Sequence, residues 1–405
     1  MNWGQRAQDR LSDIARCSVD GEGVTRFPFT SQHEAALDAI RSWMSQAGLQ
    51  VHMDAAGTLI GRKDGPEGAP TFLIGSHQDS VRNGGGYDGI MGVVLGCLAL
   101  EKLAADGNEL PFSVEILAFA DEEGVRFPTA LMGPRALAGT FDPAVLAMTD
   151  SDGVSLRNAL AGFGGDPDRV AALARDPAKT LGYLEIHIEQ GPVLEAQDTA
   201  LGIVTGICGI ERNTVTFTGD TGHAGTVPMD SRRDALVAAS DFISAIHDAA
   251  KKVTDRRATI GALSLHPNVV NAIPRAVELT LEIRALNDAV RDDFARLARY
   301  LGDNISGERR VGFSMERTYE QPAVPCNGDL IDALSTATGA ICPTAPRLPS
   351  GATHDASAMA DLCPISMLFV RCEDGVSHKP EEFAASDDMD AAIQSIAAFL
   401  VALEV

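Results

Sequence analysis

Short apolar strands that alternate with helical segments constrain the fold of this chain more than any other feature. "PTFLIGS" (70–76), "FSVEILAFA" (112–120) and "GYLEIHIEQ" (182–190) are typical of buried strands. Helical patterns occupy residues 33–50 and 89–106. This alternation favours an α/β fold with a mixed, mostly parallel sheet and helices on both faces.

The middle of the chain has a different order of elements. Its segments read strand, helix, strand, strand, helix, strand, at residues 213–219, 231–250, 258–265, 276–285, 288–305 and 311–319. This is the ferredoxin-like order. We therefore expect one discontinuous domain formed by residues 1–209 and 322–405, and an inserted α+β domain formed by residues 210–321.

Composition excludes several classes of protein. The 405 residues are 45% hydrophobic, and the formal net charge of −23 disfavours binding to nucleic acid or to anionic membranes. The polar start "MNWGQRAQDR" does not resemble a signal peptide, and no apolar run has the length of a transmembrane helix. Seven scattered cysteines without a CxxC motif predict reduced thiols and a cytoplasmic location.

Three consecutive carboxylates, Asp121, Glu122 and Glu123, follow the strand at 112–120. Like charges this close raise one another's pKa, so we expect positive charge beside them. Divalent cations would supply it, with one glutamate as a ligand and its neighbour as a base. The alternative is an acidic helix N-terminus, where carboxylates complement the helix dipole.

"GSHQDSVRNGGGYDG" places His77, Asp79 and Asp88 directly after the strand at 70–76. Ligand groups gather beyond the carboxyl ends of strands in α/β sheets. His77 suits a metal, and Asp79 is placed to orient its imidazole. The glycines at 84–86 permit a loop that returns Asp88 to the same place. The alternative is a polar surface loop.

Two further histidines, His187 within a strand and His378 in the loop of "DGVSHKPEEF", are weak signals alone. A lone strand histidine is more often packed in the core, and a lone loop histidine is usually solvated. Together with the carboxylates they form a set that suits Zn²⁺ or, with more oxygen ligands, Mn²⁺.

Six motifs resemble, in order, those of the hydantoinase/carbamoylase-type amidases in the aminoacylase/carboxypeptidase G metallopeptidase family. They are "GSHQDSVRNGGGYDG", "FADEEGVRF", "EIHIEQGPVLE", "GHAGTVPMDSRRDA", "SGATHDA" and "DGVSHKPEE". The resemblance extends over about residues 10–403. It implies a metal-binding catalytic domain and an inserted lid or dimerisation domain.

The resemblance also implies two divalent metal ions, Zn²⁺ or Mn²⁺, with Co²⁺ or Ni²⁺ as alternatives. His77 and His187 resemble the ligands of one ion, and Glu123 and His378 resemble those of the other. Asp88 would bridge both ions. Glu122 resembles the general base of the family, and Asp79 the group beside the first histidine.

Further roles follow from the resemblance alone. In the inserted domain, His223 resembles a residue that stabilises the oxyanion in the active site of the other subunit. Asn271 and Arg284 resemble a substrate-binding pair, although Arg284 alone is equally typical of a strand-end salt bridge. Gln190 resembles a residue that contacts the ureido or amide group of the substrate. His354, with its neighbour Asp355, is expected to support the wall of the site.

The expected protein is a homodimeric amidohydrolase that cleaves a linear C–N bond in a small N-carbamoyl or ureido carboxylate. N-carbamoyl-L-amino acids are the leading substrates. Allantoate amidohydrolase, β-ureidopropionase and N-acyl-amino-acid deacylase are alternatives, as is a metal-binding relative without catalysis. Departures such as "QDS" at 78–80, where relatives often have Leu-Asp-Thr, concern the choice of substrate.

Overall fold

The protein, in a computed structural model that describes residues 2–254 and 256–404, forms two compact units. The first comprises residues up to Thr205, then Cys326–Leu348 and the chain from Ala352 onward. The second comprises Gly206–Pro325 and Pro349–Gly351. Sequence reasoning placed the divisions after residues 209 and 321.

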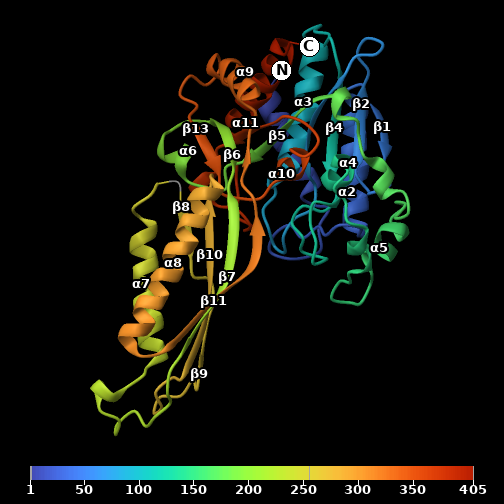
Figure 1. Cartoon of the computed structure of the whole chain (residues 1–405). Helices are drawn as coiled ribbons and strands as arrows, with labels where there is room; N and C mark the ends of the chain where they lie inside the picture. Colours follow the sequence, from blue (N-terminus) through green and yellow to red (C-terminus); the bar gives the residue numbers. More distant parts are fainter. Residues whose placement is uncertain (1, 255, 405) are drawn as a thin grey trace. The chain divides into compact units, whose positions relative to one another are not determined.

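A mixed sheet lies at the centre of the first unit (Figure 1), and its edge residues 206–207, 324–325 and 349–350 fall within the bounds given for the second. Its strands are β1 (Gln50–Met53), β2 (Leu59–Lys63), β3 (Thr71–His77), β4 (Ser113–Phe119), β5 (Thr180–Ile188), β6 (Leu201–Ile207), β12 (Val324–Pro325), β13 (Arg347–Ser350) and β14 (Ile365–Val370). The order is β1-β2-β4-β3-β5-β14-β6-β12, and β13 also pairs with β6. The central strands β4, β3, β5 and β14 are parallel, and antiparallel strands flank them.

The parallel centre positions the predicted site. His77 is the last residue of β3 and pairs with Phe119 at the end of β4. On the other side of β3, His187 lies near the end of β5 and pairs with Phe369 of β14. The carboxyl ends of these strands therefore meet at one edge of the sheet, which is the usual place for a ligand site.

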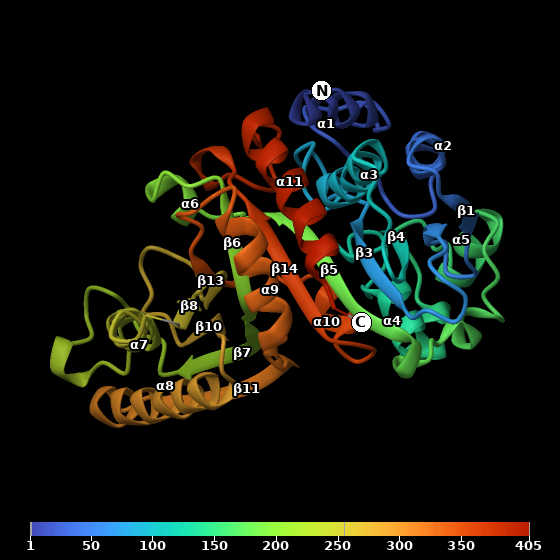
Figure 2. The same cartoon turned by 90° about the horizontal axis from the view of Figure 1, so that it is seen from above.

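Helices cover both faces of this sheet (Figure 2). One layer contains α1 (Trp3–Ile14), α2 (Ser31–Gln46), α3 (Ile90–Ala105), α9 (Gly328–Gly339) and α11 (Ser386–Ala402). The opposite face carries α4 (Met132–Ala138) and α10 (Asp355–Met359), and the shorter helices α5 (Leu156–Gly162) and α6 (Val193–Ala196) lie in the connections. Within the part of the chain that the structure describes, no helix has the length and apolar character needed to cross a bilayer.

The second unit has the expected ferredoxin-like order of elements. It consists of β7 (Gly209–Thr218), α7 (Ala235–Ala250), β8 (Arg256–Thr259), β9 (Leu263–His266), β10 (Ala276–Ala285), α8 (Asp288–Arg309) and β11 (Gly312–Gln321). The strands form an antiparallel sheet in the order β11-β7-β10-β8, with β9 also on β10. Phe217, Phe242, Leu281 and Phe294 belong to the core between this sheet and helices α7 and α8.

One predicted strand of this unit is divided. Residues 258–265 were expected to form a single strand, but β8 ends at Thr259 and β9 begins at Leu263. Between them the Ala262 N–H donates to the side-chain Oγ1 of Thr280, 3.0 Å away, and the Thr280 N–H donates to the Ala262 carbonyl. A side-chain hydroxyl has thus replaced a backbone acceptor, which interrupts the ladder.

Candidate metal centre

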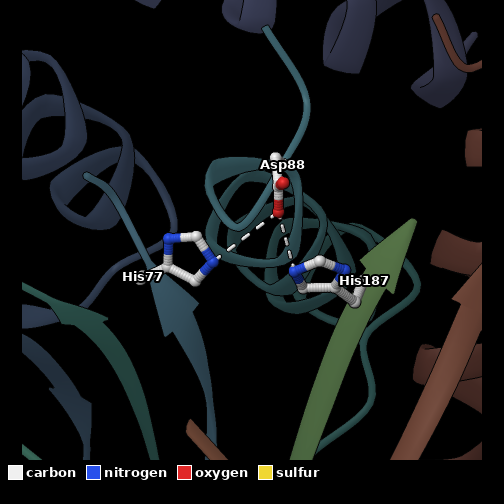
Figure 3. A group of neighbouring side chains, drawn as sticks. All are labelled: His77, Asp88 and His187. Carbon is white, nitrogen blue, oxygen red and sulfur yellow. Dashed lines mark ion pairs between the residues drawn. The ribbon is translucent and has the colours of Figure 1, made fainter. Parts of the chain in front are cut away.

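Two histidines from neighbouring strands face one carboxylate oxygen of Asp88 (Figure 3). Asp88 Oδ1 lies 3.0 Å from His187 Nε2 and 3.7 Å from His77 Nε2. All three side chains are buried. Their ligand atoms lie close enough together to hold one metal ion.

Gly89 allows the loop to bring Asp88 against His77. Its φ is +66°, and a Cβ built there would lie 2.3 Å from the His77 ring. Helix α3 begins at the next residue, so the Asp88 carboxylate also lies near a helix N-terminus, where the dipole favours negative charge. The closely packed loop explains how residues eleven apart in sequence form one group.

The other oxygen of Asp88 belongs to a second group. Asp88 Oδ2 lies 3.2 Å from His378 Nε2, and Glu123 Oε2 lies 3.9 Å from the same nitrogen. Asp88, Glu123 and His378 again place their ligand atoms close enough together for one ion. Because the two groups share Asp88 through different oxygens, this side chain has the geometry of a bridging ligand.

The charges at this edge offset one another. Burial alone would raise the pKa of Asp88, but the neighbouring His187, His378 and His77 hold it well below its usual value. Burial would lower the pKa of His77, but Asp79, Glu122 and Asp88 raise it well above its usual value. Without a metal ion, protonated histidines therefore supply part of the positive charge that the carboxylates require.

Glu122 lies beside both groups and belongs to neither. Its Oε2 is 4.0 Å from His77 Nε2, and its side chain is 9% exposed. Burial, and after it the repulsion of Glu123, Asp355 and Asp79, raises the pKa of Glu122 well above its usual value against the opposing effect of His77. Burial is thus the larger cause, whereas the sequence pointed only to repulsion between neighbours.

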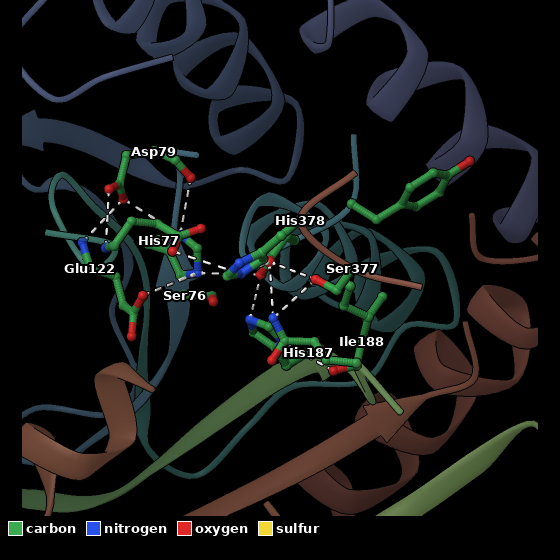
Figure 4. Close-up of polar contacts among 12 residues, drawn as sticks. Ser76, His77, Asp79, Glu122, His187, Ile188, Ser377 and His378 are labelled. Atoms are coloured by element: carbon green, nitrogen blue, oxygen red, sulfur yellow. Dashed lines mark hydrogen bonds and ion pairs between the residues drawn. The ribbon is translucent and has the colours of Figure 1, made fainter. Parts of the chain in front are cut away.

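Asp79 connects the end of β3, which provides His77, to the residues after β4, which provide Glu122 and Glu123 (Figure 4). Its Oδ1 is 3.4 Å from His77 Nδ1, the contact expected from the sequence. Oδ1 also accepts the Glu122 N–H at 3.1 Å, and Oδ2 accepts the Glu123 N–H at 3.2 Å. Sequence reasoning missed this second contact, because nothing in the local pattern shows that two loops about forty residues apart meet at Asp79.

The side chains present fit two divalent cations. The two groups offer three imidazole nitrogens and two carboxylates, the donor types that Zn²⁺ and Mn²⁺ take in proteins. Within the described residues, Oε1 of Glu123 is buried and has no hydrogen-bond partner. A buried carboxylate oxygen without a donor is costly, and a cation would satisfy it.

Asp88 has further partners that sequence reasoning did not find. Ser377 Oγ lies 3.0 Å from Asp88 Oδ2, and the Tyr87 and Asp88 N–H groups donate to Glu382. Ser377 and Glu382 lie on either side of His378 in "SHKPEE". Their place in this motif was the signal in the sequence that could have indicated these contacts. Gln190 was expected to contact substrate; its Nε2 donates to Asp88 Oδ2 at 3.0 Å.

His354 lies behind the first group. Its ring packs edge-on against His187, with 4.5 Å between ring centroids, and only 1% of the residue is exposed. Burial, and after it the proximity of His187, lowers the pKa of His354 well below its usual value, so its ring is neutral. This position suits the expected supporting role in the wall.

The remaining predicted residues belong to the second unit. His223 is exposed, and its Nδ1 accepts the Gly225 N–H at 3.1 Å. Asn271 lies in the adjacent loop, where its carbonyl accepts the Ala224 N–H at 3.0 Å. Arg284 on β10 donates from Nε to Glu282 Oε1 at 2.7 Å, so the salt bridge considered as its alternative role is present.

Comparison with known proteins identifies the family of this chain. Residues 48–402 match the model of peptidase family M20/M25/M40. An N-carbamoyl-L-amino acid amidohydrolase of Geobacillus stearothermophilus is 40% identical over 96% of this chain and 95% of its own length. An allantoate deiminase of Arabidopsis thaliana is 36% identical over 96% of this chain and 81% of its own length.

A crystal structure of a hydantoinase/carbamoylase family amidase from Burkholderia multivorans has a TM-score of 0.91 to this chain at 31% identity. It is matched over 98% of this chain and 97% of its own. The chain therefore belongs to peptidase family M20/M25/M40 and, within it, to the hydantoinase/carbamoylase-type amidases. The resemblance seen in the sequence motifs is confirmed.

Metal affinity should depend on pH. The hydrogen bond to Asp88 raises the pKa of His378 to about 8, and burial with the nearby Asp88 raises that of Glu123 to about 7. Both groups hold protons in the metal-free protein near neutrality, and ligands must lose them. We expect Mn²⁺ affinity to weaken as the pH falls from about 8 to about 6 in calorimetric titrations.

Repeating the titration in two buffers of different ionisation enthalpy counts the protons released on binding. An affinity that stays constant over this pH range, with no proton release, would contradict the assignment of His378 and Glu123 as ligands.

Proposed function

We propose that this protein is a binuclear-metal amidohydrolase that converts N-carbamoyl-L-amino acids to amino acid, CO₂ and ammonia. The observation that supports this most is the pair of ligand groups sharing Asp88, with Glu122 beside them and outside both. The choice of reaction is supported by the N-carbamoyl-L-amino acid amidohydrolase of Geobacillus stearothermophilus, which is similar to this chain over almost its whole length.

His77 and His187 would hold one cation, Glu123 and His378 the other, and Asp88 both. Such cations lower the pKa of water and polarise a carbonyl group. The choice among Zn²⁺, Mn²⁺, Co²⁺ and Ni²⁺ is part of the proposal, and we favour Mn²⁺ or Zn²⁺ because of the mixed imidazole and carboxylate donors.

Glu122 would act as the general base. Burial raises the pKa of its carboxylate in the metal-free protein, and its place beside both ligand groups suits a proton acceptor. It would take a proton from the attacking water and pass the proton to the leaving nitrogen. Asp79 would hold both Glu122 and Glu123 in place through their backbone N–H groups.

Residues of the second unit would recognise the substrate. Arg284 has a planar guanidinium suited to a carboxylate, and Asn271 would bind the same end of the molecule. His223 would donate to the developing oxyanion. Gln190 would contact the ureido group, and closure of the second unit over the site would exclude bulk water.

Allantoate is the main alternative substrate, because a relative named allantoate deiminase is 36% identical over 96% of this chain. The chemistry at the cations would be the same. The 40% identity to the carbamoyl amino acid enzyme makes that substrate the first choice. β-Ureidopropionase and deacylase activities remain alternatives of the same class.

We also propose that the active form is a homodimer located in the cytoplasm. The loops that contain His223 and Asn271 expose large apolar side chains: Met229 is 73% exposed, Val269 54% and Val270 102%. Exposed apolar side chains this close together favour contact with a partner chain. All seven cysteines are free thiols, which suits a reducing compartment.

Replacing Glu122 by glutamine should lower kcat by about 10²–10⁴-fold, the usual contribution of a general base. Metal content should stay at the wild-type value, because Glu122 belongs to neither ligand group. Steady-state ammonia release measures kcat, and inductively coupled plasma mass spectrometry measures the metal content.

The adjacent Glu123→Gln variant is the matched control, since it should lose metal as well as activity. If the Glu122→Gln enzyme has the wild-type rate, Glu122 is not the general base. A Glu122→Gln protein without metal would instead make Glu122 a ligand.

The proposed action of His223 in the partner's site can be tested by mixing inactive chains. His223→Ala and Glu122→Ala chains are co-expressed, so that about half of the dimers contain one of each. Each mixed dimer would have one intact site, and we expect about a quarter of the wild-type activity. If His223 acts within its own chain, the mixture stays inactive.

A further inference from the structure

Glu382 is a buried carboxylate that connects the loop of Asp88 to the loop of His378. It is 4% exposed and lies four residues after His378. Its Oε1 accepts the backbone N–H groups of Tyr87 and Asp88, each at 2.9 Å. Its side chain therefore fixes the backbone of one proposed ligand from the loop that provides another.

Ser377 extends this connection to the Asp88 side chain. Its Oγ lies 3.0 Å from Asp88 Oδ2 and 3.1 Å from Glu382 Oε2. A hydroxyl has one proton and donates it to one carboxylate at a time. When Ser377 donates to Asp88, that residue is held at its backbone by Glu382 and at its side chain by Ser377, both from the His378 loop.

Gly85 makes room for the carboxylate. A Cβ at Gly85 would lie 2.2 Å from Glu382 Oε1 and 2.3 Å from its Cβ, which real atoms do not tolerate. At Gly86, one residue on, the nearest atom to such a Cβ is Ala15 Cβ at 3.7 Å, an ordinary contact. The chain thus contains a glycine that Glu382 requires and, beside it, a glycine that it does not.

We propose that Glu382 is a positioning residue that sets the second metal site, formed by Asp88, Glu123 and His378, relative to the first. The inference rests on the proposed metal-dependent function. The reason is geometric: Asp88 Oδ1 faces the histidines of β3 and β5, which the sheet fixes. Asp88 Oδ2 faces His378, whose loop is joined to Asp88 by Glu382 and Ser377.

Removing Glu382 should therefore affect one ion more than the other. In Glu382→Ala we expect the bound metal to fall from two ions per chain toward one, with the second bound about 10–100-fold more weakly, as is usual when a group that orients a ligand is removed. Glu382→Gln keeps an oxygen for the two N–H groups and should recover most of that binding. Glu381→Gln, at the exposed neighbouring residue, should match wild type.

Metal per chain is measured by plasma mass spectrometry after loading with Mn²⁺ and dialysis, beside circular dichroism to verify folding. If Glu382 has only a structural role, Glu382→Ala would lower the unfolding temperature and leave the metal content at two ions per chain. Gly85→Ala against Gly86→Ala repeats the test without changing a carboxylate, and we expect loss of the second ion only in Gly85→Ala.

Folded Glu382→Ala and Gly85→Ala proteins that both bind two ions as tightly as wild type would overturn the proposal. If Glu382→Ala does not fold, the Gly85→Ala and Gly86→Ala pair decides. A wild-type enzyme that binds two ions and hydrolyses no substrate would overturn the proposed function, while the selective loss of one ion would still support the role of Glu382.

Discussion

The attraction between the buried carboxylate of Asp88 and the imidazoles around it is the interaction on which the rest of the site depends. His77 and His187 approach one oxygen, and His378 approaches the other. Buried charges of one sign are costly unless they are paired. The strand ends collect more carboxylates than these histidines offset, and the pKa of Glu122 is accordingly raised by burial and by its acidic neighbours. Such a cluster is suited to take up divalent cations, which is the basis of the proposed chemistry.

The fold supplies rigidity at this edge in two ways. Parallel pairing fixes His77 and His187 relative to each other, because both are strand residues. The groups that come from loops are held by single side chains instead. Asp79 holds the backbone of Glu122 and Glu123, and Glu382 holds that of Asp88. The precision that catalysis would need therefore depends on buried carboxylates that are themselves neither ligands nor bases.

Much of this arrangement could be predicted from the sequence. Period and composition identified the central strands and the order of elements in the second unit, and polar residues at strand ends indicated a metal site. The contacts of Asp79 and Glu382 could not be predicted, because they join loops far apart in sequence. The break between β8 and β9 was missed as well, since it depends on the hydroxyl of Thr280, a residue eighteen positions beyond Ala262. Local patterns describe strands and helices, whereas such cross-connections appear only in three dimensions.

The proposed function requires metal-dependent cleavage of a ureido C–N bond, and release of ammonia measures that reaction. Mn²⁺-loaded enzyme and a chelated control would be given N-carbamoyl-L-amino acids, N-carbamoyl-β-alanine, allantoate and N-acetyl-L-amino acids in parallel. We predict ammonia from N-carbamoyl-L-amino acids that disappears with the chelator. Ammonia from allantoate or N-carbamoyl-β-alanine alone would keep the chemistry and change the substrate. Amine release from the N-acetyl compounds alone, without ammonia from any ureido compound, would contradict the proposed function.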